Sequence, residues 1–501
     1  QPQLVSIESR GMNSAAIRFM LFVLISLWCA QAAIPANDGL RSLGVDLDRI
    51  FSDRAIARAQ VGVVVYSLNR SEVLYQKNAS RLFIPASCNK VITSAAALAR
   101  LGPEYRFETR LVTDGPVEDG ELKKNLIVVG SGDPANSARF YAGDSFAVFK
   151  KWAAALKEME IRRISGGILG YDGSFPPPKL GSGWEWEDLA YPYAAPVTAL
   201  QFNDNMIELR ITPGDPQGTP ASVNTFPLAG YLKVHNMIVT GPPRSRTEIR
   251  LEPRRGATEV VAARGTIPLK NAVVSQNVAA RRPVAYYLAA LKWVLAQEGI
   301  DVEDCETTEA KSYPATSTQL LRHKSPPLSE ILKPLLKDSL NLYAETLTRT
   351  LGLVVKGEGS FAKGKEVVEE TLDQMGIKKE DYRYADGSGL SRLNLQSPES
   401  LVRVLRFMYR HRSYSHFYDA LPVAGVDGTL AGRMKGSKAA GNVRAKTGTI
   451  SGVSAICGYV ASAEREMLAF AIILNNYTGS RAAAETVQDR AMERLVNFSR
   501  K

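Results

Sequence analysis

A serine and a lysine three positions apart could form a nucleophile and its base. In Ser87-Cys88-Asn89-Lys90, a helix that begins at Ser87 places Lys90 one turn later on the same face. A serine hydroxyl is a weak nucleophile until a base takes its proton. A lysine can act as that base where burial and nearby cations lower its pKa. The same spacing recurs from Ser360 to Lys363, so the motif alone is a weak signal.

A second candidate is Lys446-Thr447-Gly448, which Thr449 follows and which occurs once in the chain. It precedes an apolar run typical of a strand, so we expect it on or near the edge of a sheet. There a glycine would let a substrate backbone approach closely. The lysine charge and the threonine hydroxyl together suit a substrate carboxylate.

The third candidate is Ser339-Leu340-Asn341. Serine and asparagine at this spacing also begin at Ser67, Ser222 and Ser275, so context has to distinguish the copies. Ser339 lies between two predicted helices, where a loop can present a hydroxyl and an amide to a cleft. The motifs S-x-x-K, S-D-N and K-T-G together are typical of class A β-lactamases and penicillin-binding proteins. Finding the three in this order, with leucine inside the second, favours an enzyme.

Longer stretches give a more specific resemblance. The chain is similar to the class C low-molecular-mass penicillin-binding proteins, the D-Ala-D-Ala carboxypeptidase/endopeptidases of the penicillin-binding protein 4 type. The resemblance extends over nearly the whole chain and includes a long insert between the first two motifs, which class A β-lactamases lack. The stretches that carry it are Gly130 to Pro134, Gly183 to Leu189, Ala195 to Val197, Lys337 to Glu345, Asp386 to Arg392 and Val426 to Leu430.

The resemblance implies roles for the residues that match the catalytic motifs. Ser87 would be the acylated nucleophile and Lys90 its general base. Ser339 and Asn341 would shuttle protons and hold the amide of the substrate. The backbone N–H groups of Ser87 and Thr449 would form an oxyanion hole.

The resemblance also implies residues that bind substrate. Lys446 and Thr447, next to Gly448, would bind the terminal carboxylate. A side pocket would take the free amino-acid end of the third residue of the peptide stem. The matching positions are Asp188, which would bind the amino group, Arg392, which would bind the carboxylate as a guanidinium fork, Tyr193 and Ser451.

Hydrophobic periodicity places these motifs on a framework of helices and strands. Both ends of the chain combine the two element types, with helices expected at 43–56, 87–101 and 481–498 and strands at 61–66, 72–76, 453–461 and 467–475. The middle contains short strands at 126–129, 206–211, 247–251 and 259–263 and helices at 146–159 and 283–297. Three further helices are expected at 329–336, 341–351 and 365–375.

These elements and the resemblance together predict a mixed α/β fold. A serine β-lactamase/transpeptidase-like domain with an antiparallel sheet between helices would be interrupted by a mainly β insert of two small domains. We expect residues 40–108 and 311–501 to form the transpeptidase-like domain and residues 109–310 to form the insert.

The first 32 residues resemble a secretory signal peptide. An apolar run of eleven residues, Phe19 to Cys29, lies between Arg18 and Ala30-Gln31-Ala32. A run of this length is shorter than the roughly 20 residues that cross a bilayer, although an uncleaved anchor stays an alternative. Residues 1–11 look like a misplaced start, and Met12 is the better candidate for the initiating methionine. We therefore expect an exported protein, located in the periplasm.

Composition excludes several other classes of protein. The hydrophobic fraction of 45% and the charged fraction of 23% are ordinary for a globular protein. Without the leader, Cys88, Cys305 and Cys457 remain, which are too few for a disulfide scaffold. Their spacing matches no zinc site, and with only four histidines we expect no metal and no cofactor.

The net charge of +11 is spread along the chain and favours an anionic envelope partner only weakly. The expected partners are peptidoglycan peptides, with β-lactam antibiotics as covalent inhibitors and no nucleic acid. Peripheral association with a membrane stays open, and the sequence gives no oligomeric state.

The sequence thus predicts a serine-type D-Ala-D-Ala carboxypeptidase/endopeptidase that acts on peptidoglycan stem peptides and cross-links through an acyl-enzyme on Ser87. A β-lactamase is one alternative, which the long insert and the stretch from Asp386 to Arg392 argue against. A non-catalytic module that binds the wall or senses β-lactams is another, which the intact Ser87, Lys90 and Lys446 argue against.

Overall fold

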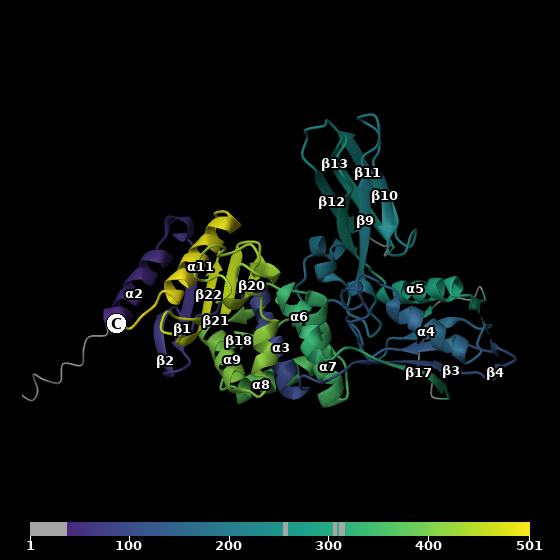
Figure 1. Cartoon of the computed structure of the whole chain (residues 1–501), viewed down its shortest axis with the longest axis horizontal. Coiled ribbons are helices and arrows are strands. Elements are labelled where there is room, and N and C mark those ends of the chain that lie inside the picture. The colour runs from purple at the N-terminus through teal and green to yellow at the C-terminus, as the bar shows by residue number, and fades with distance from the viewer. Residues whose placement is uncertain (1–37, 254–258, 304–307, 310–315) are drawn as a thin grey trace, which may run out of the picture.

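The computed structural model of the chain describes residues 38–253, 259–303, 308–309 and 316–501 (Figure 1). The predicted leader, residues 1–32, lies outside the described residues, as does Met12. Among the described residues, none of the helices combines the length and the apolar character that a bilayer crossing requires.

Both ends of the chain build one five-stranded antiparallel sheet. Its strands lie in the order β2 (Glu72–Lys77), β1 (Gln60–Ser67), β22 (Met467–Asn475), β21 (Val453–Ala461) and β20 (Arg444–Ile450). Every residue of β1 after Gln60 is buried, because helices cover both faces of the sheet. The strand β20, which contains the Lys446-Thr447-Gly448 motif, forms one edge, as predicted.

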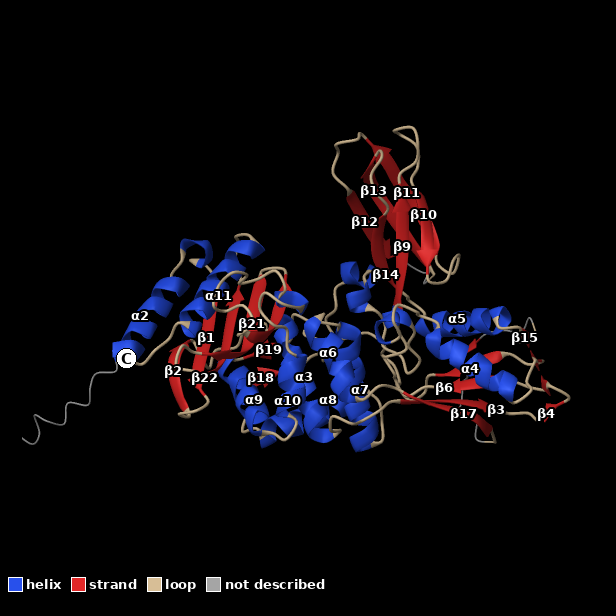
Figure 2. Ribbon diagram, viewed as in Figure 1, coloured by secondary structure: helices blue, strands red, loops and turns tan. Residues whose placement is uncertain are grey.

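Alternate residues of β1 face two separate hydrophobic cores. Val63 and Val65 pack with α2 (Asp38–Phe51) and α11 (Arg481–Val496) on one face. Val64 and Tyr66 belong to the larger core on the other face, where α3 (Asn89–Arg100) lies (Figure 2). That core also includes residues of α6 (Leu328–Lys337), α7 (Asn341–Lys356), α8 (Phe361–Gln374), α9 (Pro398–Arg410) and α10 (Tyr414–Ala420).

The middle of the chain forms a second body with its own core. A five-stranded sheet has the order β16 (Thr308–Glu309), β8 (Ile168–Tyr171), β6 (Leu126–Val129), β3 (Glu108–Thr113) and β17 (Thr318–Lys324). The helices α4 (Ala147–Glu158) and α5 (Pro283–Gln297) contribute buried residues to this core. A smaller sheet consists of β15 (Asp301–Val302), β7 (Arg163–Ile164), β5 (Glu121–Leu122) and β4 (Val117–Glu118).

A β-rich lobe projects from this body (Figure 1). One three-stranded sheet has the order β10 (Ser222–Phe226), β9 (Met206–Thr212) and β14 (Val274–Ala279). The other has the order β11 (Lys233–Gly241), β13 (Val260–Pro268) and β12 (Glu248–Pro253), with β11 parallel to β13. The mixed α/β architecture, with an antiparallel sheet between helices and a mainly β insert, is thus the one predicted.

Two details differ from the prediction. The strand β17 lies beyond residue 310, where we expected the insert to end, yet it pairs with β3. No residue of β17 is buried, so the sequence has no apolar run to mark it. The helix expected at 43–56 ends at Phe51, and the Asp53 side chain begins a separate 3₁₀ turn by accepting a hydrogen bond from the backbone N–H of Ala55.

Candidate active site

Ser87 and Lys90 lie together at the start of α3. Ser87 belongs to a 3₁₀ turn, η2 (Ala86–Cys88), that leads directly into the helix. Ala86 has a φ of 45°, a left-handed conformation that costs energy for a residue with a side chain. This bend leaves Ser87 partly exposed while Lys90 is completely buried, with its Nζ 2.8 Å from Ser87 Oγ.

The amine of Lys90 has three polar neighbours. Besides Ser87 Oγ, they are Asn341 Oδ1 at 2.6 Å and the backbone oxygen of Ser388 at 2.7 Å. Burial, followed by the charge of Lys446, lowers the pKa of Lys90 well below its usual range. A neutral amine has two N–H groups and one lone pair. It can therefore donate to Asn341 and Ser388 and accept the proton of the Ser87 hydroxyl.

The second motif begins in a short loop and continues into α7. Ser339 has a φ of 62°, and α7 begins two residues later at Asn341. Both ends of the Asn341 amide are used within the protein, because Oδ1 accepts from Lys90 and Nδ2 donates to the backbone oxygen of Tyr193 at 2.8 Å. This asparagine thus links the amine to the insert.

The turn from Asp386 to Ser391 forms the wall behind Lys90. Three successive carbonyl oxygens of this turn accept hydrogen bonds of 2.7–2.8 Å from α3, that of Asp386 from Asn89, that of Gly387 from Thr93 and that of Ser388 from Lys90. The turn approaches η2 so closely that a Cβ at Gly389, which has a φ of 83°, would lie 1.9 Å from the backbone oxygen of Ala86.

Two buried carboxylates hold the N–H groups of the same turn. Glu345 accepts from Gly387 at 3.1 Å and from Ser388 at 2.8 Å. Asp386 accepts from the backbone N–H groups of Gly389 and Ser391 and from the side chains of Asn394 and Trp184, at 2.6–2.9 Å. Burial, followed by the charge of Asp386, raises the pKa of Glu345 to about 7. The sequence prediction missed Glu345 as a site residue, although its position four residues after Asn341 on one helix face was a usable signal.

The third motif packs against the nucleophile from β20. Lys446 is fully buried, its Nζ donates to the backbone oxygen of Thr447 at 2.7 Å, and burial lowers its pKa to about 8. Thr447 Oγ1 lies 2.7 Å from Thr429 Oγ1. A Cβ at Gly448 would lie 2.5 Å from the Pro85 oxygen and 2.9 Å from the Ser87 nitrogen. The chain's own nucleophile turn therefore requires a glycine here, a reason that the sequence did not indicate, and the close approach of a substrate backbone stays a prediction.

The motifs meet at a cleft of about 390 Å³. Eight of the twelve predicted site residues line it: Ser87, Asp188, Tyr193, Ser339, Asn341, Arg392, Thr449 and Ser451. The other four, Lys90, Lys446, Thr447 and Gly448, lie behind or beside this lining. Glu185, Gly389, Leu390 and Ile450 complete it.

The outer wall of the cleft joins the insert to two loops of the sheet domain. Tyr193 OH donates to Asp188 Oδ1 at 3.1 Å, and the two rings of Tyr191 and Tyr193 stack with their centroids 5.4 Å apart. Elsewhere in the same lining, Arg392 Nη1 donates to the backbone oxygen of Ser451 at 2.8 Å. These side chains are at least partly exposed, unlike Lys90 and Lys446.

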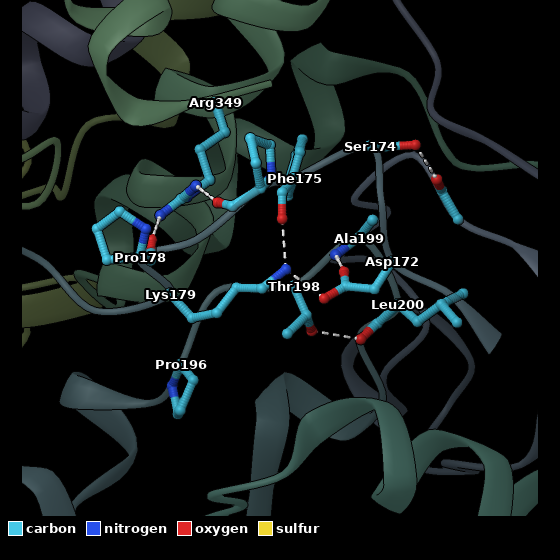
Figure 3. A network of polar contacts seen from close by, with 12 residues as sticks. Asp172, Ser174, Phe175, Pro178, Lys179, Pro196, Thr198, Ala199, Leu200 and Arg349 are labelled. Atoms are coloured by element: carbon cyan, nitrogen blue, oxygen red, sulfur yellow. Dashed lines mark hydrogen bonds and ion pairs between the residues drawn. The ribbon is translucent and has the colours of Figure 1, made fainter. Parts of the chain in front are cut away.

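A polar network holds residues 172–179 and 198–200, which flank the segment that carries Asp188 and Tyr193 (Figure 3). Arg349, on α7, donates to the backbone oxygens of Pro176, at 3.0 Å, and of Pro178. Lys179 donates to the buried carboxylate of Asp172 and to a neighbouring carbonyl, while Asp172 accepts from the backbone N–H of Ala199. The insert is thereby fastened to the same helix that contains Asn341 and Glu345.

No metal site competes with this arrangement in the part of the chain that the structure describes, because no three His, Cys, Asp or Glu side chains there are grouped to hold an ion. The second S-x-x-K copy has a structural role, since Ser360 caps α8 by accepting from the backbone N–H of Lys363 at 3.2 Å.

Comparison with known proteins assigns this geometry to a family. A model of the D-Ala-D-Ala carboxypeptidase 3 (S13) family matches residues 43–498. The chain belongs to this family. The S13 carboxypeptidase is a hydrolase, and the family predicted from the sequence is confirmed.

Several relatives match most of this S13 carboxypeptidase. A D-alanyl-D-alanine carboxypeptidase of Actinomadura sp. (strain R39) is 34% identical, over 97% of this chain and 91% of its own length. The D-alanyl-D-alanine carboxypeptidase DacB of Haemophilus influenzae is 29% identical, over 88% of this chain and 90% of its own. The crystal structure of penicillin binding protein 4 (dacB) from H. influenzae superposes with a TM-score of 0.78 at 26% identity, over 89% of this chain and 97% of that one. The predicted fold class is thereby confirmed.

Two thiols lie behind the nucleophile. Cys88 Sγ donates to the backbone oxygen of Lys446 at 3.3 Å, and Cys457 pairs with Lys446 across β20 and β21. Both cysteines are buried and free, and a hydrogen bond from the Cys457 thiol to Cys88 Sγ, together with burial, raises the pKa of Cys457 well above its usual range. Cys88 is not among the residues that line the cleft.

Proposed function

We propose that the chain is a serine-type carboxypeptidase and endopeptidase that acts on peptidoglycan through an acyl-enzyme on Ser87. It would remove the terminal D-alanine of D-Ala-D-Ala stem peptides and cleave the cross-links between stems. The observation that supports this most is the fully buried Lys90 amine, 2.8 Å from Ser87 Oγ and flanked by two further acceptors. A neutral amine in this position is the base that serine acyl transfer needs.

In the proposed acylation, Ser87 Oγ attacks the carbonyl carbon of the scissile bond while Lys90 Nζ takes the hydroxyl proton. The backbone N–H groups of Ser87 and Thr449 would stabilise the negative charge that develops on the carbonyl oxygen, a contribution of about 3 kcal/mol per donor to the barrier. The C–N bond then breaks, and the leaving amine takes a proton by way of Ser339. Water attacks the resulting ester, which releases the shortened peptide as a carboxylate and restores the Ser87 hydroxyl.

Recognition would be divided between two parts of the cleft. The ammonium of Lys446, with Thr447, would attract the terminal carboxylate of the substrate. Asp188 would bind the free amino group of the third stem residue, and Arg392 would bind its carboxylate, beside Tyr193 and Ser451. The exposed position of these outer groups supports a role in binding rather than in proton transfer.

Inhibition by β-lactams and an exported location complete the proposal. A β-lactam presents a strained amide that Ser87 would open to form a stable ester. One of the H. influenzae penicillin binding protein 4 structures is described as a complex with a novel β-lactam. An exported location, in the periplasm, follows from the predicted signal peptide and from the location of peptidoglycan.

Timed intact-mass spectrometry with benzylpenicillin tests the proposal, with peptide mapping of any adduct and Ser87→Ala as the matched control. We expect an adduct on Ser87 that lasts for many minutes and is absent from Ser87→Ala, together with release of D-alanine from a D-Ala-D-Ala peptide. An adduct that disappears while drug is consumed would indicate a β-lactamase. If no adduct forms on the wild-type protein, acyl transfer is the wrong reaction and a binding module becomes the better explanation.

A further inference from the structure

A second concave site lies away from the cleft, on the helix α9. This basic groove has a volume of about 420 Å³, and the end of α8 and one face of α9 line it. Its arginines are Arg403, Arg406 and Arg410, at spacings of three and four residues that place them on one face of the helix, and His411 follows directly after the helix end. Met375 and Phe407 supply its apolar surface. It shares no lining residue with the catalytic cleft.

The positive charge of the basic groove is only partly balanced. Arg403 is paired with Glu399 at 2.6 Å and also donates to the backbone oxygen of Gly376. Among the described residues, no carboxylate lies within ion-pair distance of Arg406 or Arg410. The only polar contact of Arg410 there is to the hydroxyl of Ser71, at 3.4 Å.

Other arginines of this chain have their charge balanced by a carboxylate. Arg433 is paired with Asp489 at 2.5 Å, Arg494 with Asp46 at 2.7 Å and Arg500 with Glu466 at 2.8 Å. Two arginines without such partners in one concavity leave a local charge of about +2. An anion from outside the chain would neutralise this charge.

The groups in the basic groove are oriented before any ligand arrives. The Arg406 guanidinium lies over the Tyr66 ring, 4.0 Å from its centroid, which restricts the long side chain. The His411 ring stacks on Phe407 at 5.5 Å, and its Nδ1 accepts from the backbone N–H of Ser413. Since Nδ1 is an acceptor, the neutral ring carries its proton on Nε2, which is a further donor. Such preorganisation reduces the entropic cost of binding.

The chemistry of the donors selects the ligand. Guanidinium groups donate in a planar fork that matches the oxygens of a phosphate, and they have no acceptor to offer. A carboxylate, with one charge and two oxygens, would satisfy only one of the two unpaired arginines. A phosphate group has the oxygens and the charge for both, and the volume leaves room for a small carbon body beside Met375 and Phe407.

We propose that the basic groove of α9 binds a phosphate group carried on a small body such as glycerol. The site goes beyond the proposed peptidase function, because it is separate from the cleft and takes a ligand of different chemistry. A free phosphoester and the headgroup of an anionic lipid both present this group.

Calorimetric titration of the full chain with glycerol 3-phosphate and with inorganic phosphate tests the groove. Arg406→Gln with Arg410→Gln removes the two unpaired charges. The charge-matched control is Arg244→Gln with Arg246→Gln, which removes two exposed arginines of the insert. We expect saturable binding to the wild type, at least about tenfold weaker binding to the groove variant and less than about twofold change in the control.

Failure of folding is controlled in two ways. Acylation by benzylpenicillin reports an intact cleft, and the single variant Arg410→Gln leaves the Arg406–Tyr66 contact in place and should still weaken binding. Absence of saturable phosphate binding to the wild type overturns the proposal, as does an equal loss in the groove variant and in the control, which would reflect net charge alone.

Sedimentation with vesicles separates the two sources of the phosphate group. Vesicles of phosphatidylcholine alone are compared with vesicles of phosphatidylcholine and phosphatidylglycerol in equal parts. If the wild type pellets with the anionic vesicles and the groove variant does not, a lipid headgroup is the ligand. Binding of glycerol 3-phosphate without pelleting supports a soluble phosphoester.

Discussion

The inner and outer parts of the cleft are built in opposite ways. The inner part, around Lys90 and Glu345, is buried, and each polar atom has partners within the protein. The outer part, around Asp188 and Arg392, is partly exposed, and within the described residues each of these side chains has one short polar contact. A base with a lowered pKa requires a dry and fixed environment. Groups that recognise a substrate must keep hydrogen-bonding capacity free, and the outer wall does so.

The two parts also differ in their origin along the chain. The inner residues come from helices and turns that pack on the sheet built by both chain ends, whereas Asp188 and Tyr193 come from the insert. The hydrogen bond from Asn341 to the backbone of Tyr193 joins the two parts directly. The proposed roles assign acylation to the inner part and substrate choice to the outer part, so variants of each part should affect different measured quantities.

The largest effect is expected from removal of the buried base. Lys90→Met keeps an unbranched apolar stem but has no atom to accept the Ser87 proton, so acylation by benzylpenicillin should slow by about 10³-fold. Lys363→Met is the matched control, because Lys363 occupies the same place in the second S-x-x-K copy and pairs on the surface with Glu366. Stopped-flow or timed mass spectrometry measures both rates. Equal rates for Lys90→Met and wild type would show that another group takes the proton.

A smaller effect is expected from removal of the Glu345 carboxylate, which contacts Lys90 only indirectly, through Ser388. Its two carboxylate oxygens accept from Gly387 and Ser388, and Ser388 O in turn accepts from Lys90. Glu345→Gln has one acceptor and an NH₂ group, so one of the two backbone N–H groups loses its partner, at a cost of about 2 kcal/mol in unfolding free energy. Displacement of Ser388 should slow acylation by about 30-fold.

The pH profile distinguishes a positioning role of Glu345 from a merely structural one. The charge of Glu345 raises the pKa of Lys90, against the larger lowering by burial. Removal of that charge should therefore move the acidic limb of the acylation profile to lower pH. Glu370→Gln, which removes a surface partner of Lys356, should leave the profile unchanged. A slower Glu345→Gln with an unmoved acidic limb would assign the loss to packing alone.

In the inner part of the cleft, the sequence predicted the residues of the catalytic motifs but not the residues that hold them in place. Ser87 and Lys90 were found because one helical turn brings them together, which is a local property. Glu345 was missed: its spacing from Asn341 indicated the helix face, but not the turn more than 40 residues away that the folded chain brings to α7. The contact of Gly448 with the nucleophile turn was not predicted, because the sequence gives no information on which backbone lies opposite a missing Cβ.

The outer wall shows the same limit at longer range. Asp188 and Arg392 were named only from a family resemblance, because nothing local relates residues so far apart. The structure places both in the lining of one cleft, together with Ser87. The network of Arg349, Asp172 and Lys179, which holds the insert segment in place, has no sequence pattern of its own.

A moderate effect, confined to peptide substrates, is expected from the outer wall. Asp188→Asn with Arg392→Gln removes both charges and keeps a polar side chain at each position. The specificity constant for a stem peptide with a free third-residue end should fall by about tenfold, because partly exposed ion pairs contribute about 1 kcal/mol. Acylation by benzylpenicillin, which lacks that end, should stay within about twofold of wild type. A parallel loss for both ligands would show that the outer wall supports the base as well.

The smallest effect is a pH dependence that links Lys446 to the carboxylate of the ligand. Burial lowers the pKa of Lys446 to about 8, so its ammonium is charged at pH 7 and increasingly neutral above pH 8. A neutral amine still donates a hydrogen bond but no longer attracts a carboxylate by charge. The second-order rate of acylation by benzylpenicillin should therefore fall about threefold between pH 7 and pH 9. Benzylpenicillin methyl ester, which has no carboxylate, should show no such fall. If both compounds lose rate together, the alkaline limb belongs to a group in the chemical step, and Lys446 would then belong with the inner part of the cleft rather than with recognition.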